Sequence, residues 1–100
     1  MDRGTFEDGL DDVLAELRSL IIAKQHDYGH GNILAFGEKG VLVRANDKLA
    51  RLKHLLWDRP GEQPANESIR DSWRDLAGYA IIALMLRDGT FELPLAGDEG

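Results

Sequence analysis

The chain has 100 residues, of which 43% are hydrophobic and 30% charged, and its formal net charge at pH 7 is −6. This is the composition of one ordinary globular domain, 1–100, and the acidic balance argues against direct nucleic-acid binding, which needs a basic surface. The absence of cysteine excludes disulfides, zinc–thiolate sites and thiol nucleophiles. Because no signal-like segment opens the chain and no apolar run is long enough for a bilayer, we expect a cytoplasmic protein without membrane contact.

The first predicted helix begins at Thr5, where Asp8 stands three residues on and gives a capping-box start. An apolar face follows at helical spacing. Its members are Phe6, Leu10, Val13, Leu14, Leu17, Leu20 and Ile21. Lys24 continues this face and has two interpretations. It is either a lysine whose stem covers the edge of the core or a cation that faces a ligand.

Residues 25–41 predict a long glycine-rich loop, with at most a short helical turn at 33–36. Four glycines, an aspartate and an asparagine interrupt any regular period there. A loop of this length in a small domain is usually functional. The glycines match neither the Walker nor the Rossmann pattern, since no strand precedes them. Tyr28, inside this loop, either stacks on a base or packs at a hinge.

Two further helices are predicted, one over about 42–57 that stops before Pro60 and one from an N-cap at Asn66 to a stop at Gly89. The predicted buried side of the second helix is apolar: Leu42, Ala45, Leu49, Leu52 and Leu56. The predicted core face of the third is also apolar: Ile69, Trp73, Leu76, Ala80 and Ala83.

The third helix is apolar on nearly every side between residues 78 and 86, more than a three-helix domain can cover. We therefore expect a homodimer or homotetramer, with Ile82 and Met85 near the contact. The remaining residues form an arm with an acidic tail at about 96–100. The predicted fold is all-α, a compact three-to-four-helix bundle completed by oligomerisation.

Two charged stripes bear on function. The first is acidic, at intervals of four residues on the third helix: Glu67, Asp71 and Asp75. The second is a basic edge of the second helix that contains one aspartate: Arg44, Asp47, Lys48 and Arg51. Like charges four residues apart repel unless something positive covers them. Either the two stripes form an ion-pair seam, or the carboxylates hold a divalent cation beside basic groups for phosphate. Spacing alone leaves both interpretations open.

Three segments in order carry a family resemblance. They are Lys24-x-x-Asp27-Tyr28-Gly29, Arg44-x-x-Asp47-Lys48-x-x-Arg51-Leu52 and Glu67-x-x-x-Asp71-x-x-x-Asp75-Leu76-Ala77-x-Tyr79-Ala80. Together they resemble the phage and bacterial nucleotide modification associated domain type 1 family. That family is similar to the MazG-type all-α nucleoside triphosphate pyrophosphohydrolases, which show Glu-x-x-Glu where this chain has Arg44 and Asp47.

The resemblance implies a MazG-like, usually oligomeric bundle that binds a nucleoside triphosphate and magnesium, with manganese as an alternative metal. It implies three metal ligands: Asp47, Asp71 and Asp75. Glu67 would be a further ligand or the general base. Three basic residues would hold the phosphates: Arg44, Lys48 and Arg51. Lys24 and Tyr28 would close over the sugar or base.

With the resemblance added, the metal interpretation is preferred to the ion-pair seam. The expected function is metal-dependent hydrolysis of a nucleoside triphosphate at a phosphoanhydride bond, in nucleotide metabolism or modification. Phage origin, and hence a host cytoplasm, is implied by the family alone. Two alternatives stay open: a nucleotide-binding module without turnover, and a small helical phage protein whose third helix binds a host partner.

Overall fold

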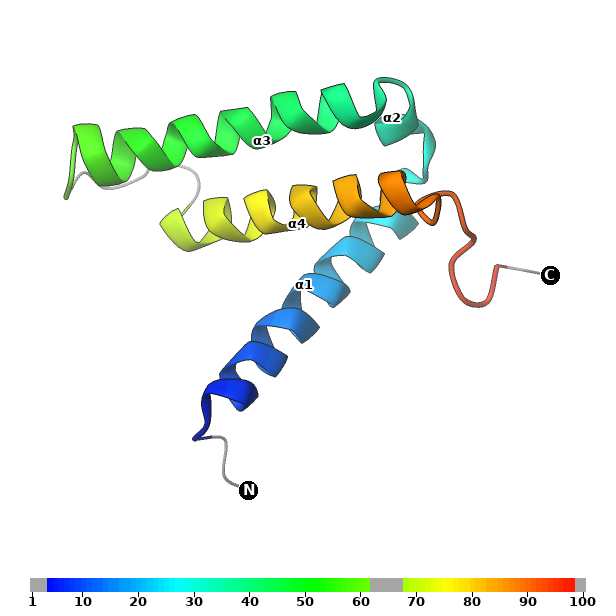
Figure 1. The fold of residues 1–100 in the computed structure, drawn as a ribbon, viewed down its shortest axis with the longest axis horizontal. Coiled ribbons are helices and arrows are strands. Elements are labelled where there is room, and N and C mark those ends of the chain that lie inside the picture. Colours follow the sequence, from blue (N-terminus) through cyan, green and yellow to red (C-terminus); the bar gives the residue numbers. More distant parts are fainter. Residues whose placement is uncertain (1–3, 62–67, 99–100) are drawn as a thin grey trace.

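In a computed structural model, which describes residues 4–61 and 68–98, the chain is all-α, as the sequence predicts. The helices are α1 (Phe6–Tyr28), α2 (Gly31–Leu34), α3 (Gly37–Lys53) and α4 (Ile69–Asp88), and a π-helical turn, η1 (His54–Asp58), extends α3. Within the two described ranges no strand forms and no helix is long and apolar enough to cross a membrane. In Figure 1, α3 and α4 lie side by side, and the C-terminal part of α1 crosses α4.

The predicted start of α1 is confirmed. The Thr5 hydroxyl accepts a hydrogen bond from the Asp8 backbone N–H at 3.1 Å, and the Asp8 carboxylate accepts one from the Thr5 N–H at 3.3 Å. The end of α1 is different from the prediction, because the helix continues through residues 25–28 and stops at Gly29, whose φ of +70° suits glycine.

The predicted loop over 25–41 is therefore wrong. α2 and the first turn of α3 occupy most of it, and the chain turns at two glycines, Gly29 and Gly37, which both have positive φ. The other two glycines of the segment, Gly31 and Gly40, lie inside helices. A glycine count cannot separate these two uses, since glycine permits a turn but does not impose one.

The N-cap of α4 is Ser68, two residues after the predicted Asn66. Its hydroxyl accepts a hydrogen bond from the Asp71 N–H at 2.9 Å, and the Asp71 carboxylate accepts one from the Ser68 N–H at 3.4 Å. Asn66 and the acidic Glu67 lie outside the described residues. The predicted stop at Gly89 is confirmed, with a left-handed φ of +74°.

The buried apolar core is small. Five large apolar side chains are buried in the described residues: Leu17, Val41, Leu52, Leu55 and Phe91. The predicted buried side of α3 is largely wrong, because Leu42, Leu49 and Leu56 are exposed. Apolar residues occupy two adjacent sides of this helix, so periodicity alone does not identify the side that faces α4.

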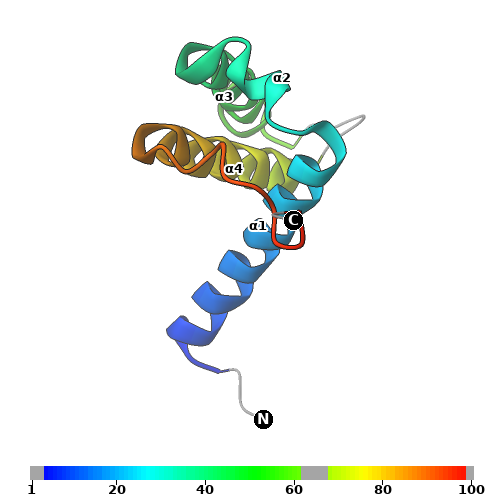
Figure 2. The same ribbon diagram turned by 90° about the vertical axis from the view of Figure 1, so that its right-hand side faces the viewer.

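On α4 the predicted core face is also only partly right. Trp73 and Ala80 are exposed, whereas Ser72 and Gly78 are buried. α1 crosses α4 at Gly78, where an added Cβ would lie 4.0 Å from the Ile21 side chain. After α4, the arm folds back, and the ring of Phe91 meets the ring of His30 edge to face at a centroid distance of 5.7 Å. Figure 2 shows that the N-terminal half of α1 runs away from the layer formed by α3 and α4.

Candidate functional site

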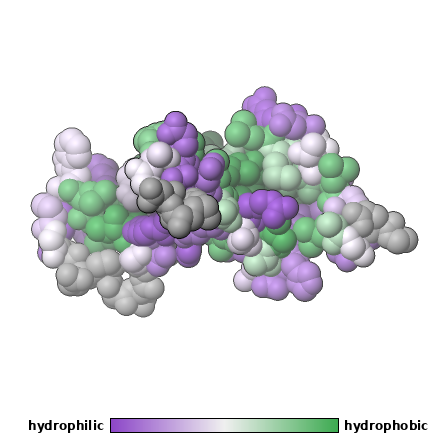
Figure 3. Space-filling model, turned by 90° about the horizontal axis from the view of Figure 1, so that it is seen from below, coloured by the Kyte–Doolittle hydropathy of each residue, from purple (hydrophilic) through white to green (hydrophobic). Residues whose placement is uncertain are grey.

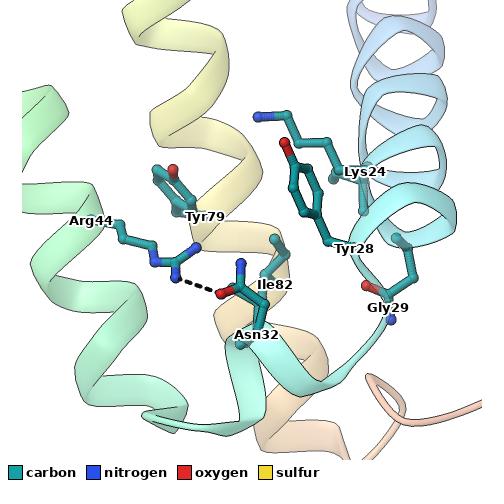
Figure 4. Close-up of a pocket in the computed structure, with 10 residues that line it drawn as sticks. Lys24, Tyr28, Gly29, Asn32, Arg44, Tyr79 and Ile82 are labelled. Atoms are coloured by element: carbon teal, nitrogen blue, oxygen red, sulfur yellow. Dashed lines mark hydrogen bonds between the residues drawn. The ribbon is translucent and has the colours of Figure 1, made fainter.

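A pocket of about 290 Å³ lies where the C-terminal end of α1 meets α2, α3 and α4 (Figure 4). It is called the site pocket below, and ten residues line it: Ile21, Lys24, Gln25, Tyr28, Gly29, Asn32, Ile33, Arg44, Tyr79 and Ile82. It includes three residues that the sequence assigns to nucleotide binding, namely Lys24, Tyr28 and Arg44.

The lining of the site pocket is basic and aromatic. Lys24 and Tyr28 lie one turn apart on α1, Arg44 comes from α3, and Tyr79 comes from α4. Figure 4 shows Lys24 and Tyr28 extending from α1 towards α4, Tyr79 on α4, and Arg44 extending from α3 towards α2. None of the lining residues is acidic. The site pocket is therefore suited to an anionic ligand that carries a flat ring.

Arg44 is held by α2. A terminal nitrogen of its guanidinium donates to the amide oxygen of Asn32 at 3.3 Å, as the dashed line in Figure 4 marks. A guanidinium has five N–H donors, so this one bond uses a small part of its capacity. Asn32 thus orients the arginine in the wall of the site pocket and uses only one of its donors.

The positions of Lys24 and Tyr28 bear on their alternative interpretations. Tyr28 is 69% exposed at the last position of α1, and its ring lines the site pocket instead of packing at a hinge. Lys24 is exposed and lines the same pocket, which favours the ligand-facing interpretation over covering of the core edge. Gly29, directly after Tyr28, turns the chain with a φ of +70°, and Asn32 and Ile33 of α2 then line the pocket.

The carboxylates of α4 are engaged with cations and with the helix end. Asp75 pairs with Lys48 of α3 at 3.2 Å, and both side chains are about four-fifths buried, with 17% and 22% exposed. Asp71 pairs with Arg74 at 3.3 Å and also caps α4. One ion pair of the proposed α3–α4 seam is thus present.

The predicted metal ligands are not gathered into one cluster. Asp47 is exposed on α3, and Glu67 falls outside the described residues. In the described part of the chain, no group of three or more His, Asp or Glu side chains is arranged to hold a metal ion. The magnesium site therefore stays a prediction.

The Lys48–Asp75 pair nevertheless lies close to the site pocket along the helices. Lys48 is one turn after Arg44 on α3, and Asp75 is one turn before Tyr79 on α4. Arg51 lies a further turn along α3 and does not line the site pocket. The predicted basic edge thus begins in the pocket wall and continues away from it along the seam between α3 and α4.

Three polar residues that line the site pocket are not among the residues that the sequence analysis assigns to a site: Gln25, Asn32 and Tyr79. Gln25 and Asn32 fall in the segment that the sequence predicts to be a loop, and a loop does not indicate where its side chains point. Tyr79 had a usable signal, because it stands four residues after Asp75 and so continues the acidic stripe's face of α4.

A cluster on the other side of α1 was also missed. The carboxylate of Glu16 accepts hydrogen bonds from both terminal nitrogens of Arg70 at 2.7 Å and from Arg74 at 3.2 Å. These two arginines, chiefly the hydrogen bond from Arg70, lower the pKa of Glu16 to about 2. This cluster fixes the middle of α1 to the N-terminal half of α4.

Comparison with known families gives one match. A family described as nucleotide modification associated domain 1 matches residues 24–86. The matched segment begins at Lys24 and contains the polar side chains of the site pocket. No curated protein and no solved structure matches the chain significantly.

Proposed function

The chain belongs to the nucleotide modification associated domain 1 family, and from that premise we propose that it binds a nucleotide in the site pocket. The observation that carries the proposal is the lining of the pocket, which brings two cations and two tyrosines from three helices into one pocket. Both pairs of residues lie within the segment that matches the family.

The cations are suited to the phosphates. The planar guanidinium of Arg44 can donate two parallel hydrogen bonds to one phosphate group, and the Lys24 ammonium can neutralise a second negative charge. The pocket wall runs from Arg44 towards Lys48, so a longer phosphate chain would follow α3 in that direction.

The tyrosines are suited to the base. Stacking of a base on an aromatic side chain contributes about 1–3 kcal/mol in single-stranded nucleic-acid sites and tolerates different bases. Tyr28 comes from α1 and Tyr79 from α4, and both line the site pocket, so each offers a ring on which a base can stack. The volume of about 290 Å³ lies at the small end of ligand pockets, roughly 300–1,000 Å³, which suits a base and part of the sugar.

Nucleotide binding is tested by calorimetric titration with nucleoside triphosphates in the presence of a chelator and then of magnesium. We expect Arg44→Ala to weaken the affinity roughly tenfold or more, because a hydrogen bond to a charged group contributes about 1.5–3 kcal/mol. Lys53→Ala is the matched control, since it removes one positive charge from an exposed position near the far end of α3. Equal weakening by both variants would show only a general charge effect and would contradict the assignment.

The second candidate function is turnover, as metal-dependent hydrolysis of a nucleoside triphosphate. It is supported by the position of Asp75, one turn from Tyr79, with Asp71 one turn further along the same helix. In the described residues no group of three or more His, Asp or Glu side chains is arranged to hold a metal ion, and Asp75 is already paired with Lys48. Binding of magnesium by these residues would therefore require the ion pair to open.

Asp75→Asn separates the two interpretations of this carboxylate. If its role is the ion pair with Lys48, we expect a loss of about 1–3 kcal/mol in the free energy of unfolding, more than for an exposed pair because both side chains are largely buried, and no magnesium response in either protein. If it holds a cation, magnesium with a triphosphate stabilises the wild type, and the variant loses this response. Product analysis for pyrophosphate then distinguishes an enzyme from a binding module. A chain that responds to no nucleotide would leave the third alternative, a helical protein that binds a partner.

A further inference from the structure

The N-terminal half of α1 presents an apolar face that nothing in the described chain covers. Phe6 is 82% exposed, and the next members of the face are about half exposed: Leu10 47%, Val13 45% and Leu14 50%. Leu17, one turn later on the same face, is 7% exposed because it packs against α4. The face is thus continuous along the helix, and only its C-terminal part has a packing partner within the chain.

The solvent-accessible surface of the chain is larger than that of a compact monomer of the same mass. The chain exposes 7527 Å², whereas a compact monomer of 11.1 kDa would expose about 5,700 Å². Its radius of gyration is 15.8 Å, against about 13 Å for a compact domain of 100 residues. Figure 3, seen from below, shows several hydrophobic patches separated by hydrophilic residues.

A cavity of about 330 Å³ opens beside this exposed half, between α1 and α4. Its walls include Val13 and Leu17 of α1, together with Trp73 and Ala77 of α4, and the Glu16–Arg70–Arg74 cluster forms its rim. Trp73 is 51% exposed. The cavity is therefore mostly apolar, and one of its walls is a large aromatic ring that lacks cover.

We infer that a second copy of this chain covers the face, with its α1 antiparallel to the first and its Phe6 seated in the cavity beside Trp73. Phe6 cannot reach the cavity of its own chain, because it stands eleven residues, or about 16.5 Å, before Leu17 on a straight helix. In an antiparallel pair whose two-fold axis passes between residues 11 and 12, Phe6 lies opposite Leu17 and Leu10 lies opposite Val13. Each copy thus supplies the aromatic side chain and the cavity that the other lacks.

The exposed area is large enough for a contact with a second copy of the chain. Each chain exposes roughly 1,800 Å² more than a compact monomer, spread over the whole molecule. A specific interface needs only about 800 Å² from each partner, so the face and the cavity together require less than half of this excess. The contact differs from the one predicted near Ile82 and Met85, because both of these side chains are partly buried and face α1 or the arm of their own chain.

The charges beside the face are also complementary in this arrangement. Glu7 and Arg18 lie on the same edge of α1, where they are too far apart to pair within one helix. In the antiparallel pair, Glu7 of one copy comes within reach of Arg18 of the other, and the symmetry makes this contact twice. A helix from an unrelated protein would have no reason to repeat this pattern.

The first test is sedimentation equilibrium of the full chain from about 1 to 100 µM, without nucleotide, for the wild type, Phe6→Ala and Leu84→Glu. We expect a wild-type dimer and a dissociation constant at least tenfold higher for Phe6→Ala. Leu84→Glu is the control, because Leu84 is an exposed apolar residue of α4 outside the cavity. A monomeric wild type would overturn the inference, and so would dissociation by Leu84→Glu alone.

The second test uses charge reversal and does not depend on cavity packing. Arg18→Glu should weaken the dimer, and adding Glu7→Arg in the same chain should restore it, because the pairs are then reversed between copies. Rescue within a single helix is excluded by the separation of the two positions, so rescue shows the antiparallel contact. A double variant that is weaker than Arg18→Glu would contradict the proposed register.

A third test follows Trp73 directly. In a Trp57→Phe background Trp73 is the sole tryptophan, and its emission should shift to the blue as the concentration rises through the dissociation constant. Phe6→Ala should abolish the shift. A shift that persists in Phe6→Ala would mean that another group fills the cavity.

Discussion

The two halves of α1 have the same helical sequence pattern but different surroundings. The C-terminal half packs on α4 at Gly78, carries Lys24 and Tyr28, and forms a wall of the site pocket. The N-terminal half carries an equally apolar face that stays exposed within one chain. Periodicity therefore identifies a face that needs a partner, but it does not say whether the partner belongs to the same chain.

The largest difference between the halves is expected from alanine substitution in each. Leu17→Ala should lower the free energy of unfolding by about 2–4 kcal/mol, because it removes a buried side chain and leaves a cavity. Leu10→Ala, at a half-exposed position, should cost less than about 1 kcal/mol at concentrations where the chain is monomeric. Urea denaturation at several protein concentrations measures both. Equal losses of unfolding free energy in the two monomeric variants would contradict the difference in packing between the halves of α1.

The next largest loss of stability is expected from substitution at the turn between α1 and α2. Gly29→Ala places a Cβ on a residue with φ of +70°, which should cost about 1–2 kcal/mol of stability and weaken nucleotide binding by displacing Tyr28 and α2. Gly31→Ala is the control, since Gly31 is helical and has open space at its Cβ, and it should stabilise the chain by about 0.5–1 kcal/mol. Thermal melts and titrations compare the two. A tolerated Gly29→Ala would show that the turn has another conformation in solution.

The ends and turns of the helices show how much of the fold could be predicted from the sequence alone. The helix caps at Thr5 and Gly89 follow from local residues, so they were predicted correctly. The loop over 25–41 was not, because only the tertiary fold decides which glycines turn and which continue a helix. For the same reason the buried side of α3 could not be chosen between two apolar sides.

The candidate site was predicted in part, and the resemblance contributed most of it. Lys24, Tyr28 and Arg44 meet in one pocket although they come from two helices. Their convergence depends on the crossing of α1 over α4, which no local pattern contains. The metal ligands stay predictions, because Asp71 and Asp75 are placed by a helix cap and an ion pair whose partners, Ser68 and Lys48, the stripe pattern did not include.

A smaller effect is expected at the two N-caps. Ser68→Ala and Thr5→Ala each remove a hydroxyl that accepts a backbone hydrogen bond, and each should cost about 1 kcal/mol in a helix that must stay folded to its first turn. In the proposed dimer the start of α1 gains packing neighbours, so Thr5→Ala should cost more above the dissociation constant than below it, whereas Ser68→Ala should cost the same at both concentrations. Denaturation below and above the dissociation constant would show this difference.

The smallest expected effect is the pH dependence contributed by Glu16. Its pKa is lowered from 4.5 to about 2 in the folded chain by Arg70 and Arg74, so its stabilisation is complete above pH 4.5 and disappears as the pH falls towards 2. The effect is modest because the pair is exposed to solvent. Urea midpoints between pH 6 and 2.5 should fall more steeply in the wild type than in Glu16→Gln. Parallel profiles would mean that the pair contributes nothing in solution.

The length of α1 has a mechanical consequence. The helix runs 23 residues without a break, and its crossing of α4 lies near Ile21, close to one end. The contact with α4 extends back to Glu16, so ten residues of helix, or about 15 Å, lie beyond it, and a rotation of about 10° there would move the Phe6 end by roughly 3 Å. The helix therefore acts as a lever with its short arm in the site pocket and its long arm at the opposite end of the molecule. A ligand that tilted the short arm slightly would displace the long arm far enough to alter how two chains fit together.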